Sequence, residues 1–118
     1  MQIQVSTEFV RALKSLNKKY PSLKADYLRL LADLNENPLL GDELFSGCRK
    51  VRMAIKSKRK GKSGGARVIL YLEIEEDTIT LLYIYDKSDI ENVSTEFIRY
   101  LLSTWNTEKE KTDSDEEP

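Results

Sequence analysis

Residues 66–85, ARVILYLEIEEDTITLLYIY, decide the fold of this 118-residue chain. Apolar and β-branched residues fill 66–74 and 78–85, and the acidic residues 75–77 between them are typical of a hairpin turn. The second segment is apolar on both faces, which predicts a central strand. Upstream, residues 51–55 alternate apolar with polar side chains, which predicts a third strand with one buried and one exposed face.

Three amphipathic helices are expected around these strands. We expect Ser6 to cap the first, Ser22 to cap the second, and Ser94 to cap the third. Pro21 separates the first two, so they should form an antiparallel hairpin, preceded by a short edge strand over residues 2–5. The apolar stripes are Phe9, Val10, Leu13 and Leu16; Leu23, Tyr27, Leu30, Leu31 and Leu34; and Phe97, Ile98, Leu101, Leu102 and Trp105.

The predicted fold class is α+β, with an N-terminal helical hairpin packed on a small antiparallel β-sheet and a C-terminal helix. We expect the helices mainly on one face of the sheet, which leaves the other face for a ligand. Residues 1–106 should form a single domain. Residues 107–118 hold six acids and two lysines, and such a segment is too charged and too poor in apolar groups to order itself. We therefore expect a disordered acidic tail.

The composition, 40% hydrophobic and 33% charged, is that of a globular domain. The chain has no apolar run of the roughly 20 residues that a membrane span needs, and no signal-peptide pattern, so a cytoplasmic protein is expected. One cysteine, Cys48, and no histidine exclude an intramolecular disulfide, a Cys/His zinc site and imidazole catalysis. Cys48 is expected either as a small buried residue or, beside Arg49 and Lys50, as a thiolate of lowered pKa.

The net charge of −1 conceals a strong separation of charge. Residues 49–67 carry +9 with no acid, and the rest of the chain carries −10. Lysine and arginine without interspersed acids are typical of a nucleic-acid surface. By the alternation, Arg52 and Lys56 should face solvent, and Arg67 should join them if the two strands pair antiparallel. A further hypothesis is that the acidic tail competes with nucleic acid for this basic segment.

Two motifs, KSKRKGKSGGARVI at 56–69 and LYIYDKS at 82–88, resemble the RelE/ParE superfamily of toxins from type II toxin-antitoxin systems. The similarity is greatest to the HigB-like RelE branch and covers residues 5–104. It implies a ribosome-dependent mRNA endoribonuclease that inhibits translation and is silenced by a cognate antitoxin, which we expect to be a helix-turn-helix protein. Relatives of the ParE type instead poison DNA gyrase.

The resemblance also implies roles for individual residues. Arg67 stands where the family keeps an arginine that contacts the scissile phosphate. Lys56 and Lys58 stand near lysines that act as base and charge stabiliser, and Lys87 lies near a basic residue that follows the third strand. Some members use a tyrosine in the last helix, near the position of Ser94, and others use histidines, which this chain lacks.

Such an enzyme needs no metal if the 2′-hydroxyl of the RNA attacks the neighbouring phosphorus. Arg67 would stabilise the charge that develops there, and Lys56 or Lys58 would remove the proton. Tyr85 is expected to stack on a base or to donate a proton, whereas packing is the simpler role for Tyr71. The remaining residues expected to bind RNA are Arg49, Lys50, Arg52, Arg59, Lys60 and Lys62.

No metal site and no cofactor are assigned, because a hairpin turn explains the carboxylates near residues 73–77. Two alternatives stay open: a ParE-like gyrase-inhibiting toxin without catalytic residues, and a non-catalytic nucleic-acid-binding module.

Overall fold

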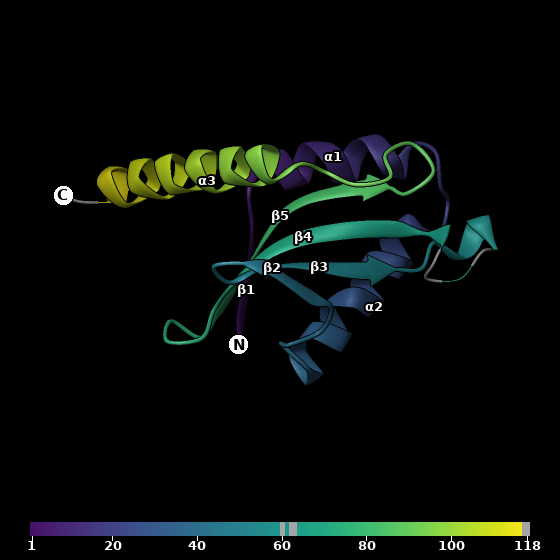
Figure 1. Cartoon of the computed structure of the whole chain (residues 1–118), viewed down its shortest axis with the longest axis horizontal. Coiled ribbons are helices and arrows are strands. Elements are labelled where there is room, and N and C mark those ends of the chain that lie inside the picture. Colours follow the sequence, from purple (N-terminus) through teal and green to yellow (C-terminus); the bar gives the residue numbers. More distant parts are fainter. Residues whose placement is uncertain (60, 62–63, 117–118) are drawn as a thin grey trace.

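The computed structural model describes residues 1–59, 61 and 64–116, with side chains up to Lys111. The elements are β1 (Gln2–Val5), α1 (Thr7–Asn17), α2 (Leu23–Glu36), β2 (Asp42–Phe45), β3 (Cys48–Met53), the 3-10 turn η1 (Lys56–Lys58), β4 (Ala66–Glu73), β5 (Thr78–Asp86) and α3 (Thr95–Glu116). Figure 1 shows their arrangement. The α+β class is confirmed.

The sheet has the order β1-β5-β4-β3-β2 and is mixed. Strands β2 to β5 pair antiparallel, but β1 runs parallel to β5. The prediction of an antiparallel sheet is therefore wrong at this edge, where no hairpin joins the two strands and so none dictates their direction. Strand β2 was not predicted, because its residues are almost all exposed and lack the period of two that marks a half-buried strand.

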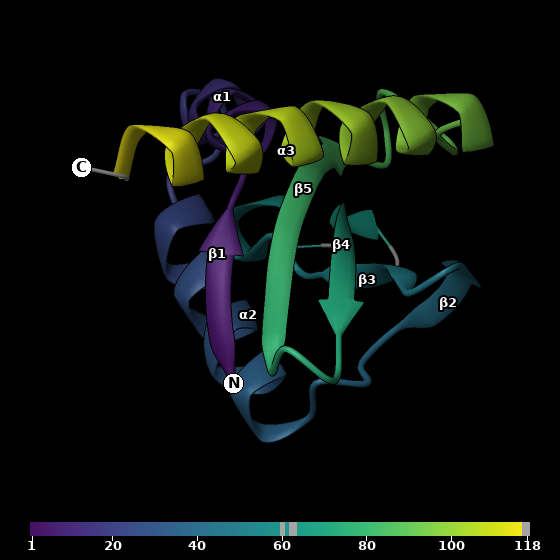
Figure 2. The same cartoon turned by 90° about the vertical axis from the view of Figure 1, so that its left-hand side faces the viewer.

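Helices cover both faces of the sheet. The side chains of Val68 and Leu70 pack with α1 and α2, whereas Ile69 between them packs with α3. Figure 2 shows α3 running across β5, with α2 on the far side of the strands. The expectation that one face is left open is thus wrong, because the apolar stripe of α3 needs a partner of its own and finds it on that face.

Two of the three predicted helix caps are confirmed. Ser6 Oγ accepts a hydrogen bond from the N–H of Phe9 (3.1 Å), and Ser94 Oγ accepts one from Phe97 (3.1 Å). Ser22 does not cap α2, because its hydroxyl is used elsewhere. It donates to Asp26 Oδ2 (2.7 Å) and accepts from the N–H of Ser57 (2.9 Å), a contact across the fold that a local pattern does not contain.

Helix α3 continues to Glu116, so residues 107–116 differ from the expected disordered tail. The carboxylate of Glu108 accepts hydrogen bonds from the N–H of Thr7 (3.1 and 3.3 Å) and from its hydroxyl. A carboxylate at the N-terminus of α1 is favoured by the helix dipole. The end of α3 and the η1 turn lie at opposite ends of the longest axis of the molecule (Figure 1), so the structure does not support a tail that competes for the basic segment.

One glycine of the loop before β4 is required by a close approach between strands. A Cβ at Gly65 would lie 2.2 Å from the carbonyl oxygen of Met53 and 3.0 Å from the nitrogen of Ile55. Both are backbone atoms at the end of β3, so neither can rotate away. Gly65 thus lets β3 and β4 stay close together just before Arg67.

The substitution Gly65→Ala should lower the free energy of unfolding by about 1–3 kcal/mol, because the added methyl group forces the two strands apart. Gly61→Asn is the matched control. Gly61 has a φ of +65° and nothing within 4 Å of a Cβ, and asparagine tolerates that conformation. Urea unfolding of both variants measures the difference, and equal stabilities would contradict the proposed strand contact.

Candidate nucleic-acid interface

The register of the sheet brings Arg52, Arg67 and Tyr85 into one row. Arg52 on β3 lies directly opposite Arg67 on β4, and Arg67 lies directly opposite Tyr85 on β5. Opposed residues of neighbouring strands point to the same face, with Cβ atoms roughly 5 Å apart. The expectation that Arg52 and Arg67 lie on the same face of the sheet is confirmed. We call these three residues the arginine row.

The members of the arginine row differ in exposure. Arg52 is exposed, but Arg67 is 4% and Tyr85 3% exposed. The expectation that Arg67 faces solvent is wrong, because the connection from β5 to α3 passes over this face of the sheet. Lys50 Nζ on β3 donates a hydrogen bond to Asn92 Oδ1 of that connection (3.1 Å).

Burial sets the electrostatics of the inner part of the arginine row. It lowers the pKa of Arg67, and the charge of Arg52 lowers it further. Burial raises the pKa of Tyr85, and the charge of Arg67 opposes that rise. Tyr85 Oη is the one buried side-chain oxygen or nitrogen among the described residues that has no hydrogen-bond partner. A row with Arg67 next to a hydroxyl that still has a hydrogen bond to give, and with Arg52 on the strand beyond, is suited to an oxyanion.

Arg52 connects the arginine row to the surface. In the part of the chain that the structure describes, it forms no ion pair. It lines a groove of about 420 Å³ between α2 and the β2–β3 hairpin, together with Lys50, Asp33 and Asp42. Of the arginine row, only Arg52 lines this groove, and two carboxylates line it as well.

Lys56 does not continue the strand as predicted. Strand β3 ends at Met53, and the chain folds into η1, where Lys56 is exposed. The turn is dictated by contacts from α2, since Asp26 Oδ2 accepts a hydrogen bond from the N–H of Lys56 (3.1 Å) and Ser22 holds the N–H of Ser57. Arg59 follows with a φ of 59° and is also exposed.

Lys58 was predicted as a reactive cation of the basic surface, and the structure places it in an internal ion pair. Its side chain is 9% exposed, and Nζ lies 2.7 Å from Asp86 Oδ1 and 5.6 Å from the centre of the Tyr20 ring. Asp86 was not predicted as a functional residue. The available signal was its place, a carboxylate at the end of an apolar strand within the LYIYDKS motif.

Asp86 accepts hydrogen bonds from three segments of the chain. Besides Lys58, these come from the hydroxyl of Tyr20 and from the hydroxyl (2.7 Å) and N–H (2.9 Å) of Ser88. Burial alone would raise the pKa of Asp86, but the hydrogen bonds from Lys58, Tyr20 and Ser88 outweigh it and hold that pKa well below its usual range. The hydrogen bond to Asp86 also raises the pKa of Tyr20 to about 12. We call these residues the Asp86 cluster.

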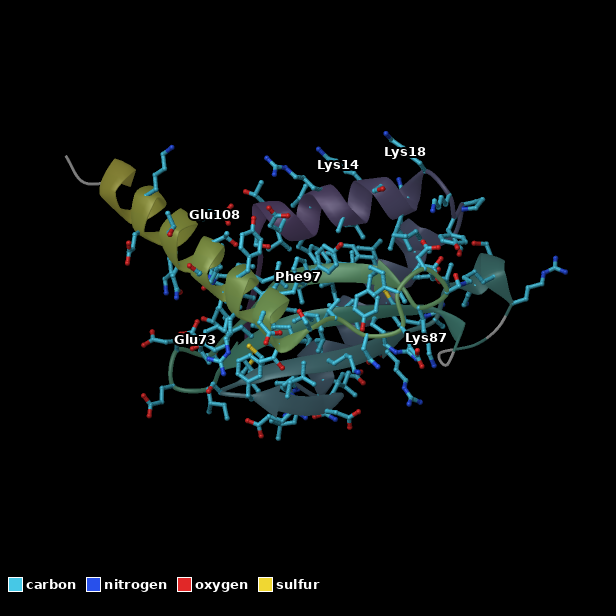
Figure 3. The ribbon with its side chains drawn as sticks, turned by 45° about the horizontal axis from the view of Figure 1, so that its top comes forward. Lys14, Lys18, Glu73, Lys87, Phe97 and Glu108 are labelled. Carbon is cyan, nitrogen blue, oxygen red and sulfur yellow. The ribbon has the colours of Figure 1, made fainter. Side chains whose placement is uncertain are left out.

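The other predicted residues are dispersed. The guanidinium of Arg49 donates hydrogen bonds to the carbonyls of Leu39 (2.8 Å), Leu40 (3.1 Å) and Gly41 (2.7 Å). These bonds would compete with its predicted role in RNA binding. Lys87 is exposed, and Figure 3 shows it at the opposite end of the sheet from Glu73. Lys60 and Lys62 lie outside the described residues.

Cys48 is not a reactive thiolate. It is fully buried under α3, and burial raises the pKa of its thiol to about 11. Tyr71 packs at the edge of the same cluster, which agrees with the packing role expected for it.

The described residues contain no group of three or more cysteine, aspartate or glutamate side chains that could hold a metal ion. Within the same part of the chain, every helix is too short or too polar to cross a membrane.

No protein-family model matches the sequence, but solved structures match the fold. One is the E. coli RelE toxin in the free state with two arginines changed to alanine: TM-score 0.52, 15% identity, 76% of this chain and 86% of that chain. Another is the isolated E. coli RelE toxin: TM-score 0.51, 14% identity, 86% of this chain and 96% of that chain. The chain has the RelE fold, so the resemblance to that superfamily is confirmed at the level of the fold.

The free energy of unfolding should fall as the pH is lowered below about 4, the pKa of an aspartate in an unfolded chain. Because the pKa of Asp86 is depressed in the folded state, its contribution is fully present above that pH and is lost as the carboxylate is protonated. Asp86→Asn should lower the neutral-pH stability by roughly 3–5 kcal/mol, since Lys58 loses its buried partner.

The Asp86→Asn variant should also depend less on pH in the acid range. Urea unfolding followed by the fluorescence of Trp105, the single tryptophan, measures both effects. An equal acid dependence in the two proteins would show that Asp86 is not the titrating group.

Proposed function

We propose that this chain is the toxin of a type II toxin-antitoxin system, of the HigB-like RelE branch, and that it cleaves messenger RNA on the ribosome. The observation that carries the proposal is the arginine row. In it Arg67 lies between Arg52 on one neighbouring strand and Tyr85 on the other, and the buried hydroxyl of Tyr85 has no partner in the described structure. A phosphodiester supplies the negative oxygens that such a row favours.

The cleavage is an attack by the 2′-hydroxyl of a nucleotide on its own 3′-phosphorus. The new O–P bond forms as the bond to the 5′-oxygen of the next nucleotide breaks. This leaves a 2′,3′-cyclic phosphate and, once the departing oxygen takes up a proton from water, a 5′-hydroxyl. Arg67 and Arg52 stabilise the charge that develops on the non-bridging oxygens, and Tyr85 donates a hydrogen bond to one of them. Arg67 and Tyr85 are buried, and buried donors act strongly because water does not screen them.

Lys56 is the favoured candidate for the base that removes the 2′-proton. It is exposed and follows the end of β3, where Ile55 lies against Gly65, two residues before Arg67. Lys58 is disfavoured, because its ammonium group is bound to Asp86. Lys87 is retained as a catalytic candidate at the same end of the sheet, and Lys50 and Arg59 as RNA contacts.

A cognate antitoxin is part of this proposal, and we expect a helix-turn-helix protein. It must neutralise or cover the arginine row and the η1 turn, since their cations would otherwise attract RNA. An acidic or extended segment that adds to a sheet edge would meet this need.

Tyr85→Phe tests the proposal. The variant should slow cleavage of ribosome-bound mRNA about 100-fold, because a donor to the developing charge is lost. Its stability should be unchanged or higher, because a buried hydroxyl without a partner costs roughly 1–3 kcal/mol. Single-turnover cleavage in a reconstituted translation system, read by primer extension and by analysis of the cut ends, gives the rate.

Tyr83→Phe is the matched control. Tyr83 lies two residues before Tyr85 on β5 and stacks on it with ring centres 6.3 Å apart. The control therefore removes the same hydroxyl oxygen from a neighbouring tyrosine. Its cleavage rate should not change. The proposal is wrong if the unchanged chain leaves translated messages intact, or if Tyr85→Phe cleaves at the normal rate.

A further inference from the structure

The side chains of the last two residues of β5, Tyr85 and Asp86, lie on opposite faces of the sheet. Tyr85 belongs to the arginine row and packs in the cluster under α3. The neighbouring residue, Asp86, is 2% exposed and is bound by Tyr20, which packs with the core on the side of α1 and α2. Successive residues of a strand point to opposite faces. Asp86 therefore acts from behind the sheet and does not touch a substrate held by the arginine row.

The η1 turn is held at two points by buried carboxylates. Asp26 of α2 binds the N–H of Lys56, and Asp86 of β5 binds the ammonium group of Lys58. Within the turn, the N–H of Lys58 donates to the carbonyl of Ile55 (2.9 Å), so both ends of the turn are fixed. The backbone of Lys56 is itself one of these points, and its exposed side chain starts from a fixed place.

The contact to Asp86 relates this turn to the arginine row. Asp86 pairs with Ala66 across β4 and β5, and the next pair along the same two strands is Arg67 with Tyr85. The carboxylate that holds the η1 turn is thus bonded through the chain to Tyr85. Through Ser88, it also holds the start of the connection from β5 to α3.

We propose that Asp86 is a positioning residue of the nuclease, which sets the place of Lys56 relative to Arg67 by holding Lys58. The inference rests on the proposed function. In a merely structural role, the ion pair would add stability, and its loss would leave the catalytic rate of the folded protein unchanged. In a positioning role, its loss slows the chemical step of a protein that is still folded and still binds the ribosome.

Asp86→Asn tests this at a temperature where circular dichroism shows the variant to be folded. The rate at saturating ribosomes should fall about 100-fold, the effect of a misplacement of about 1 Å. The KM for ribosomes should not change, because the exposed cations remain. Hydrogen exchange at the amides of Lys58 and Arg59, which are bonded within the turn, should become faster.

Asp89→Asn is the matched control. It removes the same charge three residues further on, where Asp89 forms an exposed ion pair with Lys19 at 3.6 Å. This variant should match the unchanged chain in rate, KM and exchange. Lys58→Met removes the other partner of the ion pair and should repeat the effect of Asp86→Asn. The test therefore remains possible if one of the two variants fails to fold.

The outcomes separate the two proposals. If the unchanged chain cleaves and the folded variants at Asp86 or Lys58 keep its rate, Asp86 is only structural and the proposed function stands. If KM rises while the saturated rate is kept, the ion pair serves binding and the inference is wrong. If the unchanged chain does not cleave, the proposed function is wrong and the inference falls with it.

Discussion

The pairing register of β3, β4 and β5 is the constraint on which the rest of the structure depends. It sets Arg52 opposite Arg67 and Arg67 opposite Tyr85, and a slip by one residue would move each of them to the other face. Gly65 is needed because this register brings β4 against the end of β3. The two helical layers then follow, since alternate residues of the same strands need different apolar partners.

The elements with a strong period could be predicted from the sequence, and the contacts between distant segments could not. The helices, β4 and β5 follow from apolar spacing, and Ser6 and Ser94 cap as expected because capping is local. Lys56 was expected to continue a strand because nothing near it signals Asp26, which is 30 residues away and binds the N–H of Lys56 in the η1 turn. A pattern in one segment carries no information about such a partner.

The sequence predicted which residues make up the candidate site but not how far each one is buried. Alternation gives the face on which Arg52 and Arg67 lie, yet Arg67 is buried because the connection to α3 covers that face. The charge count likewise treats all nine cations of residues 49–67 alike. The structure divides them, since Arg49 holds loop carbonyls and Lys58 neutralises Asp86, whereas Arg52, Lys56 and Arg59 stay exposed.

This division suits the chemistry proposed. Exposed cations attract a polyanion over a distance of roughly 10 Å at ordinary salt, but water and ions weaken each contact that they make. A buried arginine costs desolvation, which the lowered pKa of Arg67 reflects, and acts more strongly on a charge brought beside it. The partnerless hydroxyl of Tyr85 is a second cost at the same place. A buried hydroxyl that still has a hydrogen bond to give, opposite a buried cation on the adjacent strand, favours a binding site for an anion over an accident of packing.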